Sequence, residues 1–360
     1  MLKNNLRLRS NSQSNPQSHS RRNFIKLAAS LLLLPTALSL GCQPPKENAK
    51  SSDSKSADVS TKPSDKKYKI AVVPKGTTHV FWKSVHFGAA QAAEEFGAEI
   101  VFQGPQKEDD RDQQISLIQS LTIKGVDGIC LAPLDSEALV RPVNEAKKAG
   151  IPTVIFDSGL NAPDSIVSYV ATDNFLGGKM AAEAMAKALN EKGRVIMLRY
   201  AVGSESTEQR EEGFLAKIKE YPGIEVLSSD QYAGTSVMSS VDKAQQLFQR
   251  FDNKVDGVFA VCESNADGVL KAIEDSGLSG KIVFVGFDPS ENLRAALANK
   301  KMSAIILQDP VNMGYQAVKT MIEHLQGKEV EKRIDTGEFV ATPDNIADEK
   351  INKLLNPAQK

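Results

Sequence analysis

Residues 68–73 read YKIAVV, and similar short apolar runs follow as EIVF (99–102), GICLAP (128–133) and TVIF (153–156). Longer segments with helical periodicity separate these runs. Each run is apolar at successive positions, without the alternation of a half-exposed strand. This pattern is typical of strands in a parallel sheet that helices cover on both faces. The first half of the chain therefore predicts an α/β fold.

The same rhythm restarts after Asp173. A helical segment at 177–192 is followed by apolar runs at 194–198, 224–229, 257–261 and 282–287, again with helical segments between them. The chain therefore predicts two similar doubly wound parallel-sheet lobes. A length of 360 residues fits two domains of ordinary size.

Composition excludes several classes of protein. Hydrophobic residues make up 41% and charged residues 25%, as in an average soluble globular protein and unlike a disordered, collagenous or multi-span membrane chain. The 44 basic and 45 acidic residues leave no basic excess for a phosphate backbone, so we expect no nucleic-acid partner.

The N-terminal 41 residues resemble an export signal. Residues 20–26 read SRRNFIK and precede an apolar run, Leu27–Leu40, that is too short to span a bilayer. Paired arginines before such a run resemble the twin-arginine export motif. The run ends LSLGC, which resembles a lipoprotein processing box with Cys42 as the acylated residue. The alternative is ordinary cleavage after Ser39, which leaves Cys42 as a free thiol.

Residues 42–67 have almost no large apolar side chains and predict a disordered tether. The folded part would then be held at a membrane surface only through the lipid on Cys42. We expect a periplasmic location, or one on the outer side of the cell envelope.

Cofactor and catalytic motifs are missing from the sequence. It has no GxGxxG after the first strand and no GxxxxGK[ST], so it lacks the backbone cradle for a nucleotide. Three cysteines at distant positions form neither a disulfide framework nor a zinc knuckle. His79 and His86, seven residues apart, have no third metal ligand near them in sequence. No nucleophile with a base follows a strand, so we expect no cofactor, no metal and no enzymatic activity.

Four strings carry a resemblance to a known family. They are VATDNFLGGKMAAE (170–183), QREEGF (209–214), VFVGFD (283–288) and LQDPVNMGYQAV (307–318). In this order they resemble the periplasmic sugar-binding proteins of the ribose and galactose type, which are solute receptors of ABC importers.

That resemblance implies two lobes joined by a three-segment hinge. The crossings would lie near Thr172–Asp173, Asp309–Pro310 and Asp335–Glu338. The N-terminal lobe would then comprise 68–172 with 310–334, and the C-terminal lobe 173–308 with 338–355. The lobes would close on a ligand at the carboxyl ends of their strands.

The resemblance also implies roles for individual residues. Phe81 and Trp82 stand where the family stacks aromatic rings on a sugar, although adjacent helical residues point about 100° apart, so at most one is expected to face the cleft. Asp157 and Asp288 would accept hydrogen bonds from hydroxyls, Arg210 would donate, and Gln308 would supply another polar group. The alternatives are helix or turn capping by the two aspartates and a surface ion pair of Arg210 with Glu211 or Glu212.

Three positions depart from the family pattern. His79, Ser158 and Cys262 stand where an asparagine, an arginine and an asparagine are usual, so the resemblance does not extend to ribose specificity. Lys75 is a further candidate for ligand binding.

These observations predict an exported, monomeric receptor that captures a sugar or related polyol and presents it to an ABC permease and ATPase complex. The alternative is a sensor that reports its ligand to a membrane kinase or chemoreceptor. A repressor with this fold would need an N-terminal DNA-binding helix pair, where this chain has an export signal and tether.

Overall fold

Two six-stranded sheets organise residues 67–360, which are the residues that the computed structural model describes. Residues 67–360 lie within one compact unit. The predicted export signal, Cys42 and the tether up to residue 66 lie outside the described residues. Within 67–360, no helix combines the length and the hydrophobicity that crossing a membrane requires.

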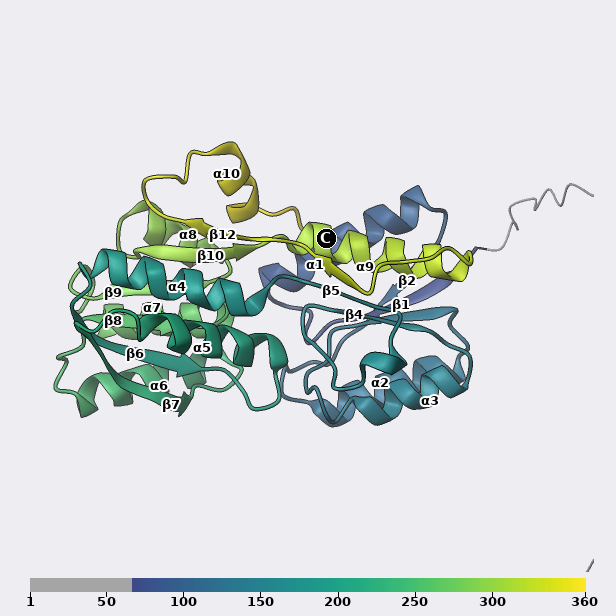
Figure 1. Cartoon of the computed structure of the whole chain (residues 1–360), viewed down its shortest axis with the longest axis horizontal. Coiled ribbons are helices and arrows are strands. Elements are labelled where there is room, and N and C mark those ends of the chain that lie inside the picture. Colours follow the sequence, from purple (N-terminus) through teal and green to yellow (C-terminus); the bar gives the residue numbers. More distant parts are fainter. Residues whose placement is uncertain (1–66) are drawn as a thin grey trace, which may run out of the picture. The chain divides into compact units, whose positions relative to one another are not determined.

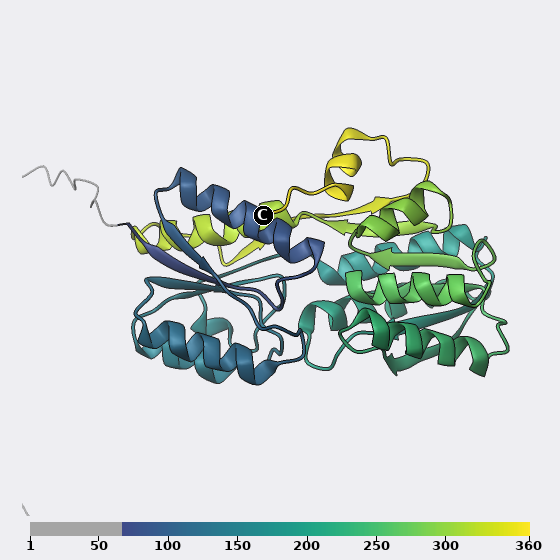
Figure 2. The same cartoon turned by 180° about the vertical axis from the view of Figure 1, so that it is seen from behind.

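The first sheet and its helices form what we call the N-terminal lobe (Figures 1 and 2). In spatial order its strands are β11 (Arg333–Asp335), β5 (Ser168–Ala171), β4 (Thr153–Phe156), β3 (Gly128–Leu131), β1 (Lys69–Val73) and β2 (Glu99–Phe102). One face packs against α1 (Val80–Glu95) and α9 (Pro310–Leu325), and the other against α2 (Arg111–Ile123) and α3 (Val140–Lys148). A short 3₁₀ helix, η1 (Pro163–Ser165), precedes β5.

The second sheet and its helices form the C-terminal lobe. Its strands, in spatial order, are β12 (Glu338–Ala341), β10 (Ala304–Gln308), β9 (Val283–Phe287), β8 (Gly257–Ala260), β6 (Gly193–Arg199) and β7 (Ile224–Tyr232). One face packs against α4 (Asn174–Ala188) and α5 (Glu205–Ile218). The other face packs against α6 (Val237–Arg250), α7 (Glu263–Asp275), α8 (Glu291–Ala298) and α10 (Glu349–Leu355).

Burial on both faces explains why the strands are apolar at every position. In β1, Ile70 and Val72 pack against α1 and α9, whereas Ala71 and Val73 pack on the opposite face. The predicted doubly wound α/β fold is confirmed. One pairing departs from the parallel pattern, because β12 runs antiparallel to β10. It enters the second sheet directly from β11 of the first, with only residues 336–337 between them.

Both lobes contain helix pairs in close contact, and glycines permit the approach in a pair from each lobe. A Cβ atom on Gly88 of α1 would overlap the carbonyl of Val311 in α9. In the other lobe a Cβ on Gly178 of α4 would overlap the carbonyl of Arg210 in α5. The second pair bears on the candidate site, because it fixes the backbone that carries the Arg210 side chain.

The chain passes between the sheets three times: after β5, after β10, and between β11 and β12. The first and third crossings lie side by side, since the Thr172 hydroxyl donates to the Gly337 carbonyl at 3.3 Å. The carboxyl ends of the parallel strands in both sheets therefore face the junction between the lobes.

Candidate functional site

A pocket with a cavity volume of about 40 Å³ lies between the lobes at these strand ends. Its position is where ligands bind in open α/β sheets. Both lobes contribute side chains. The lining residues are Lys75, His79, Phe81, Trp82, Glu108 and Asp157 from the N-terminal lobe, and Tyr200, Ser206, Thr207, Arg210, Cys262, Glu263, Ser264 and Asp288 from the C-terminal lobe.

Two aromatic rings from the first turn of α1 enter the pocket together. Phe81 and Trp82 both line it, so the prediction that at most one would face the cleft is wrong. Their rings lie 4.8 Å apart at 86° to each other, which lets adjacent side chains present a corner of two apolar surfaces to one space. Trp82 also packs edge-on against Phe156 at the end of β4.

Lys75, just after β1, is the centre of one polar cluster. Its Nζ lies 3.3 Å from Asp157 Oδ2 and donates to the hydroxyls of Ser204 and Ser206, each at 3.1 Å. The two serines belong to the C-terminal lobe, so Lys75 bridges the lobes. All of these side chains are buried. The contact places an amino group with two hydroxyl partners beside the buried Asp157 carboxylate.

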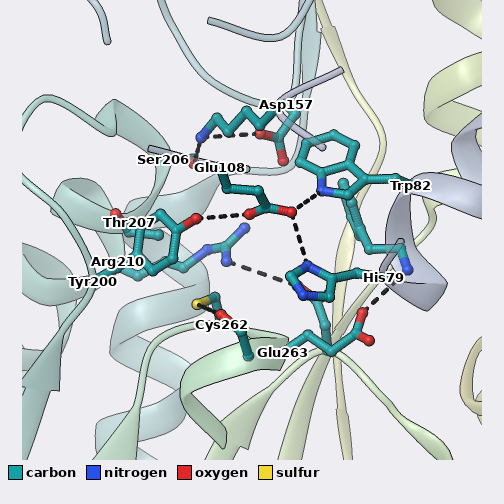
Figure 3. Close-up of a pocket in the computed structure, with 14 residues that line it drawn as sticks. His79, Trp82, Glu108, Asp157, Tyr200, Ser206, Thr207, Arg210, Cys262 and Glu263 are labelled. Atoms are coloured by element: carbon teal, nitrogen blue, oxygen red, sulfur yellow. Dashed lines mark hydrogen bonds and ion pairs between the residues drawn. The ribbon is translucent and has the colours of Figure 1, made fainter. Parts of the chain in front are cut away.

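Arg210, on α5, is the centre of a second polar cluster (Figure 3). Its Nε donates to Asn174 Oδ1 at 2.8 Å, and Nη1 donates to the Val261 carbonyl at 3.0 Å. Nη1 also lies 3.8 Å from Asp288 Oδ2, and the guanidinium stacks 3.8 Å above the Phe287 ring. The side chain is buried and points into the pocket, so the alternative of a surface ion pair with Glu211 or Glu212 is wrong.

Asp288 follows β9 and is buried beside Arg210. Burial raises its pKa to about 6, although the Arg210 charge and the Gln308 hydrogen bonds act in the opposite direction. The Gln308 amide donates to both carboxylate oxygens, at 3.1 and 3.0 Å. Above pH 6 this group is an ionised acceptor that faces the pocket.

Glu263, at the start of α7, reaches across to the other lobe. Its carboxylate accepts the backbone N–H groups of Val80 and Phe81, at 3.2 and 3.1 Å, and so caps the first turn of α1. Burial raises the pKa of Glu263 to about 7, against the His79 charge and these two hydrogen bonds.

Glu108 and Tyr200 were missed by the strand-end argument. Glu108 lies between β2 and α2, and its carboxylate receives hydrogen bonds from Trp82 and Tyr200 and pairs with His79 (Figure 3). The available signal was weak: Glu108 is one of several acids in the polar stretch 103–112, which has no periodicity to show the buried one. Tyr200 immediately follows β6, and its position could have indicated it.

The remaining predicted residues lie at or behind the pocket wall. Cys262 lines the pocket, and burial raises the pKa of its thiol to about 12, so it is neutral there. Ser158 and Gln308 are buried and do not line the pocket. The Ser158 hydroxyl accepts the Ser206 N–H at 3.1 Å from the other lobe, whereas Gln308 holds Asp288.

Metal binding finds no support among residues 67–360, where no three His, Cys, Asp or Glu side chains are grouped as metal ligands. His79 pairs with Glu108, with Nδ1 2.8 Å from Oε1. The His86 ring stacks on the Phe102 ring, with 4.0 Å between the ring centroids.

The chain belongs to the periplasmic binding protein domain family, which its residues 70–329 match. The ribose import binding protein of Escherichia coli is 30% identical over 264 residues, covering 73% of this chain and 87% of that protein. The D-allose-binding periplasmic protein of the same organism is 29% identical over 261 residues, covering 70% and 83%.

Solved structures agree in fold. A carbohydrate transporter solute-binding protein from Agrobacterium radiobacter, in complex with D-arabinose, has a TM-score of 0.77 and 32% identity, covering 81% of this chain and all of that one. An ABC transporter solute-binding protein from Agrobacterium vitis, bound to α-D-tagatopyranose, has a TM-score of 0.77 and 31% identity, covering 80% and 99%.

Proposed function

We propose that this chain is an exported solute receptor that encloses a sugar or related polyol between its two lobes and delivers it to an ABC importer. The observation that carries the proposal is the composition of the interlobe pocket: two apolar rings on one side and buried carboxylates with cationic partners around them. A sugar ring has apolar C–H faces and a polar edge, and this pocket offers surfaces for both.

The charges of the pocket also favour an uncharged ligand. Among the described residues, each charged side chain that lines the pocket has a partner. The pairs are His79 with Glu108, Lys75 with Asp157, Arg210 with Asp288, and Glu263 with the α1 amides. A charged ligand would have to displace one of these partners and leave it buried and unpaired, at considerable cost. Hydroxyl groups add hydrogen bonds without that cost, since each both donates and accepts.

Relatives support the ligand class. The similar proteins with names or bound molecules include receptors for ribose and allose and structures with D-arabinose and tagatose. Binding needs no chemical step, so the proposal assigns no catalytic residue.

Hinge closure is part of the proposal. We place the hinge at the three crossings and the lobes at 68–172 with 310–334 and 173–308 with 338–355. A ligand that contacts both lobes binds the closed arrangement better than the open one, and therefore shifts the population toward closure.

A thermal-shift screen tests the ligand class directly. Purified protein is mixed with pentoses, hexoses, inositols and nucleosides. We expect at least one sugar or polyol to raise the melting temperature, because a ligand that binds only the folded state stabilises it by mass action. Asp288→Ala should abolish this shift. The control is Asp256→Ala, which breaks a more exposed Arg–Asp pair outside the pocket and should keep the shift.

A parent protein that responds to none of these compounds contradicts the proposed function. If Asp288→Ala and Asp256→Ala respond equally, the ligand is not held at this pocket. Import is separated from the sensor alternative by adding the loaded receptor to the reconstituted permease and ATPase: an importer's ATPase rate rises, whereas the partner of a sensor is a kinase or chemoreceptor.

A further inference from the structure

Glu108 connects three side chains from different parts of the pocket. Its Oε1 accepts the Trp82 indole N–H at 2.6 Å and lies 2.8 Å from His79 Nδ1. Its Oε2 accepts the Tyr200 hydroxyl at 2.7 Å. The Glu108 side chain is only 11% exposed. Figure 3 shows it at the centre of the group, with Tyr200 on one side and Trp82 and His79 on the other.

We propose that Glu108 is a positioning residue that sets the ligand preference of the pocket: it fixes the Trp82 ring and takes the Tyr200 hydroxyl from the opposite lobe when the lobes meet. The inference rests on the proposed function, because it assigns a part in ligand binding to residues of the same pocket.

The Trp82 indole is held in place by its hydrogen bond to Glu108. Because the Trp82 N–H is committed to Glu108, Trp82 offers its ring surface to the pocket and no donor. Rotation of the ring away from Phe81 would break this charge-assisted hydrogen bond, which is among the stronger kinds in proteins. The angle between the two rings, and so the shape of the apolar corner, depends on Glu108.

The charges of Glu108 and His79 stabilise each other. Burial alone would raise the pKa of Glu108, but the hydrogen bond and charge of His79, with the hydrogen bonds from Tyr200 and Trp82, hold it below its usual value. Burial would lower the pKa of His79, yet Glu108, with the charges of Glu263 and Asp267 on α7, raises it to about 9. At neutral pH the two form an ion pair. Both carboxylate oxygens contact side chains of the protein, and these contacts fix Glu108 in the wall of the pocket.

The hydrogen bond between Tyr200 and Glu108 joins the two lobes. Trp82 and His79 belong to the N-terminal lobe and Tyr200 to the C-terminal lobe, immediately after β6. The Tyr200–Glu108 hydrogen bond can exist only when the lobes are in contact. It therefore stabilises the ligand-holding arrangement over the open one, and its loss should speed ligand release more than it slows capture.

Two conservative variants test the Tyr200 hydroxyl and the Glu108 charge separately. Tyr200→Phe removes the hydroxyl but keeps the ring, and leaves Glu108 paired with His79 and Trp82. Glu108→Gln keeps the size of the side chain and removes its charge. Matched controls come from Tyr315 and Glu95, which form a Tyr–Glu hydrogen bond of 2.8 Å between α9 and α1 outside the pocket. The controls are Tyr315→Phe and Glu95→Gln.

Trp82 is the only tryptophan of the chain, so its fluorescence reports binding at this site. The probes are D-arabinose, D-ribose and D-allose, with stopped-flow mixing to separate the rates. For a sugar that the parent binds, we expect Tyr200→Phe to weaken affinity about 10- to 100-fold, mainly through faster dissociation. Glu108→Gln should weaken binding as well and change the order of preference among the three sugars. The two controls should bind like the parent.

A second readout needs no ligand. In an NMR titration of the histidine rings, we expect His79 of the parent to titrate near pH 9. In Glu108→Gln the pKa of His79 should fall, because the hydrogen bond and charge of Glu108 no longer offset the effect of burial. An unchanged His79 titration in Glu108→Gln overturns the ion pair on which the inference depends.

The outcomes separate the two claims. A parent that binds its sugar, with Tyr200→Phe and Glu108→Gln matching their controls in affinity, rates and sugar preference, overturns the role of Glu108 and leaves the proposed function intact. A parent that binds no sugar or polyol overturns the proposed function, and with it the ligand role given to Glu108.

Discussion

Asp157 and Asp288 hold equivalent places in the two lobes. Each follows a central strand, β4 or β9, and each has a left-handed backbone conformation, with φ of 62° and 66°. Aspartate tolerates this region better than most residues, but the conformation still carries a cost. Each carboxylate is buried next to a cation, Lys75 or Arg210. The same costly backbone conformation occurs at the equivalent strand end of each lobe, as expected if both lobes contribute an aspartate to one binding site.

The buried Asp288 carboxylate should make stability depend on pH. Its pKa in the folded protein is raised to about 6 from 3.8, so the folded state holds the proton more tightly than the unfolded state. Its contribution is fully present below about pH 4 and is lost as the pH rises through 6, by up to about 3 kcal/mol. Asp288→Asn lacks this dependence.

Urea unfolding of the ligand-free parent and of Asp288→Asn, from pH 4 to pH 8, measures the difference. The free energy of unfolding of the parent should fall relative to that of the variant between pH 4 and pH 7, and the difference should then stay constant. Two curves that remain parallel over the whole range would show that Asp288 is not a strongly desolvated acid.

Strand ends predicted part of the site. Lys75, Asp157 and Asp288 come directly after or near apolar runs, so their positions followed from the parallel sheet. The position of Glu108 did not, because its contacts come from two distant segments, the start of α1 and Tyr200, and not from any local pattern. A helical wheel also could not predict that Phe81 and Trp82 both line the pocket. The helix α1 begins at the pocket, so side chains on two faces of its first turn can reach the same space.

At the scale of elements, α1 begins without a cap of its own. The N-cap residue His79 makes no side-chain hydrogen bond to the helix, and the amides of Val80 and Phe81 are satisfied by Glu263 from α7. A carboxylate at a helix N-terminus also interacts favourably with the helix dipole. The start of α1 is therefore completed by the opposite lobe, which links closure to the helix that carries both aromatic rings.

Replacement of Glu263 by glutamine should weaken ligand binding in a pH-dependent way. The pKa of Glu263 is raised to about 7, so at pH 8 the parent has a charged cap and at pH 5.5 a neutral one. We expect Glu263→Gln to bind about fivefold more weakly than the parent at pH 8 and equally well at pH 5.5.

Calorimetric titration of both proteins at both pH values gives the comparison. His79 and Asp288 also face Glu263, but they are present in both proteins, so the ratio of affinities isolates the cap. A ratio that is the same at pH 8 and pH 5.5 would mean that the charge on Glu263 does not hold the lobes together.

The sequence pattern located eight of the twelve strands in residues 67–360. It did not identify β5, β10, β11 and β12 as strands. β11 and β12 are short, carry polar or charged residues and are only partly buried, since they lie at the sheet edges. The antiparallel direction of β12 follows from how the chain returns to the second sheet, which no local pattern encodes.

At the scale of the whole chain, both lobes follow one plan. Read from the strand at the far edge, the orders β2-β1-β3-β4-β5-β11 and β7-β6-β8-β9-β10-β12 correspond strand for strand. The arrangement sets two sets of strand ends against each other. The lobes meet through polar side chains such as Lys75, Glu263 and Tyr200, and each buried apolar cluster of the described residues lies within one lobe. Polar contacts of this kind can open and reform.

Export and anchoring belong to residues outside those described, and remain proposals from the sequence. If Cys42 is acylated, the parent should incorporate a radiolabelled fatty acid and sediment with membranes, whereas Cys42→Ser should do neither. Replacement of Arg21 and Arg22 by lysine should keep the chain in the cytoplasm if export depends on the twin-arginine motif. Absence of label from the parent would favour cleavage after Ser39.

Small-angle scattering tests most directly whether a ligand closes the two lobes. Curves are recorded for the ligand-free protein and for the protein saturated with the sugar that gives the largest thermal shift. We predict a smaller radius of gyration with the sugar, because a ligand that contacts both lobes favours their closed arrangement. Curves that superimpose at saturating sugar would contradict capture by closure.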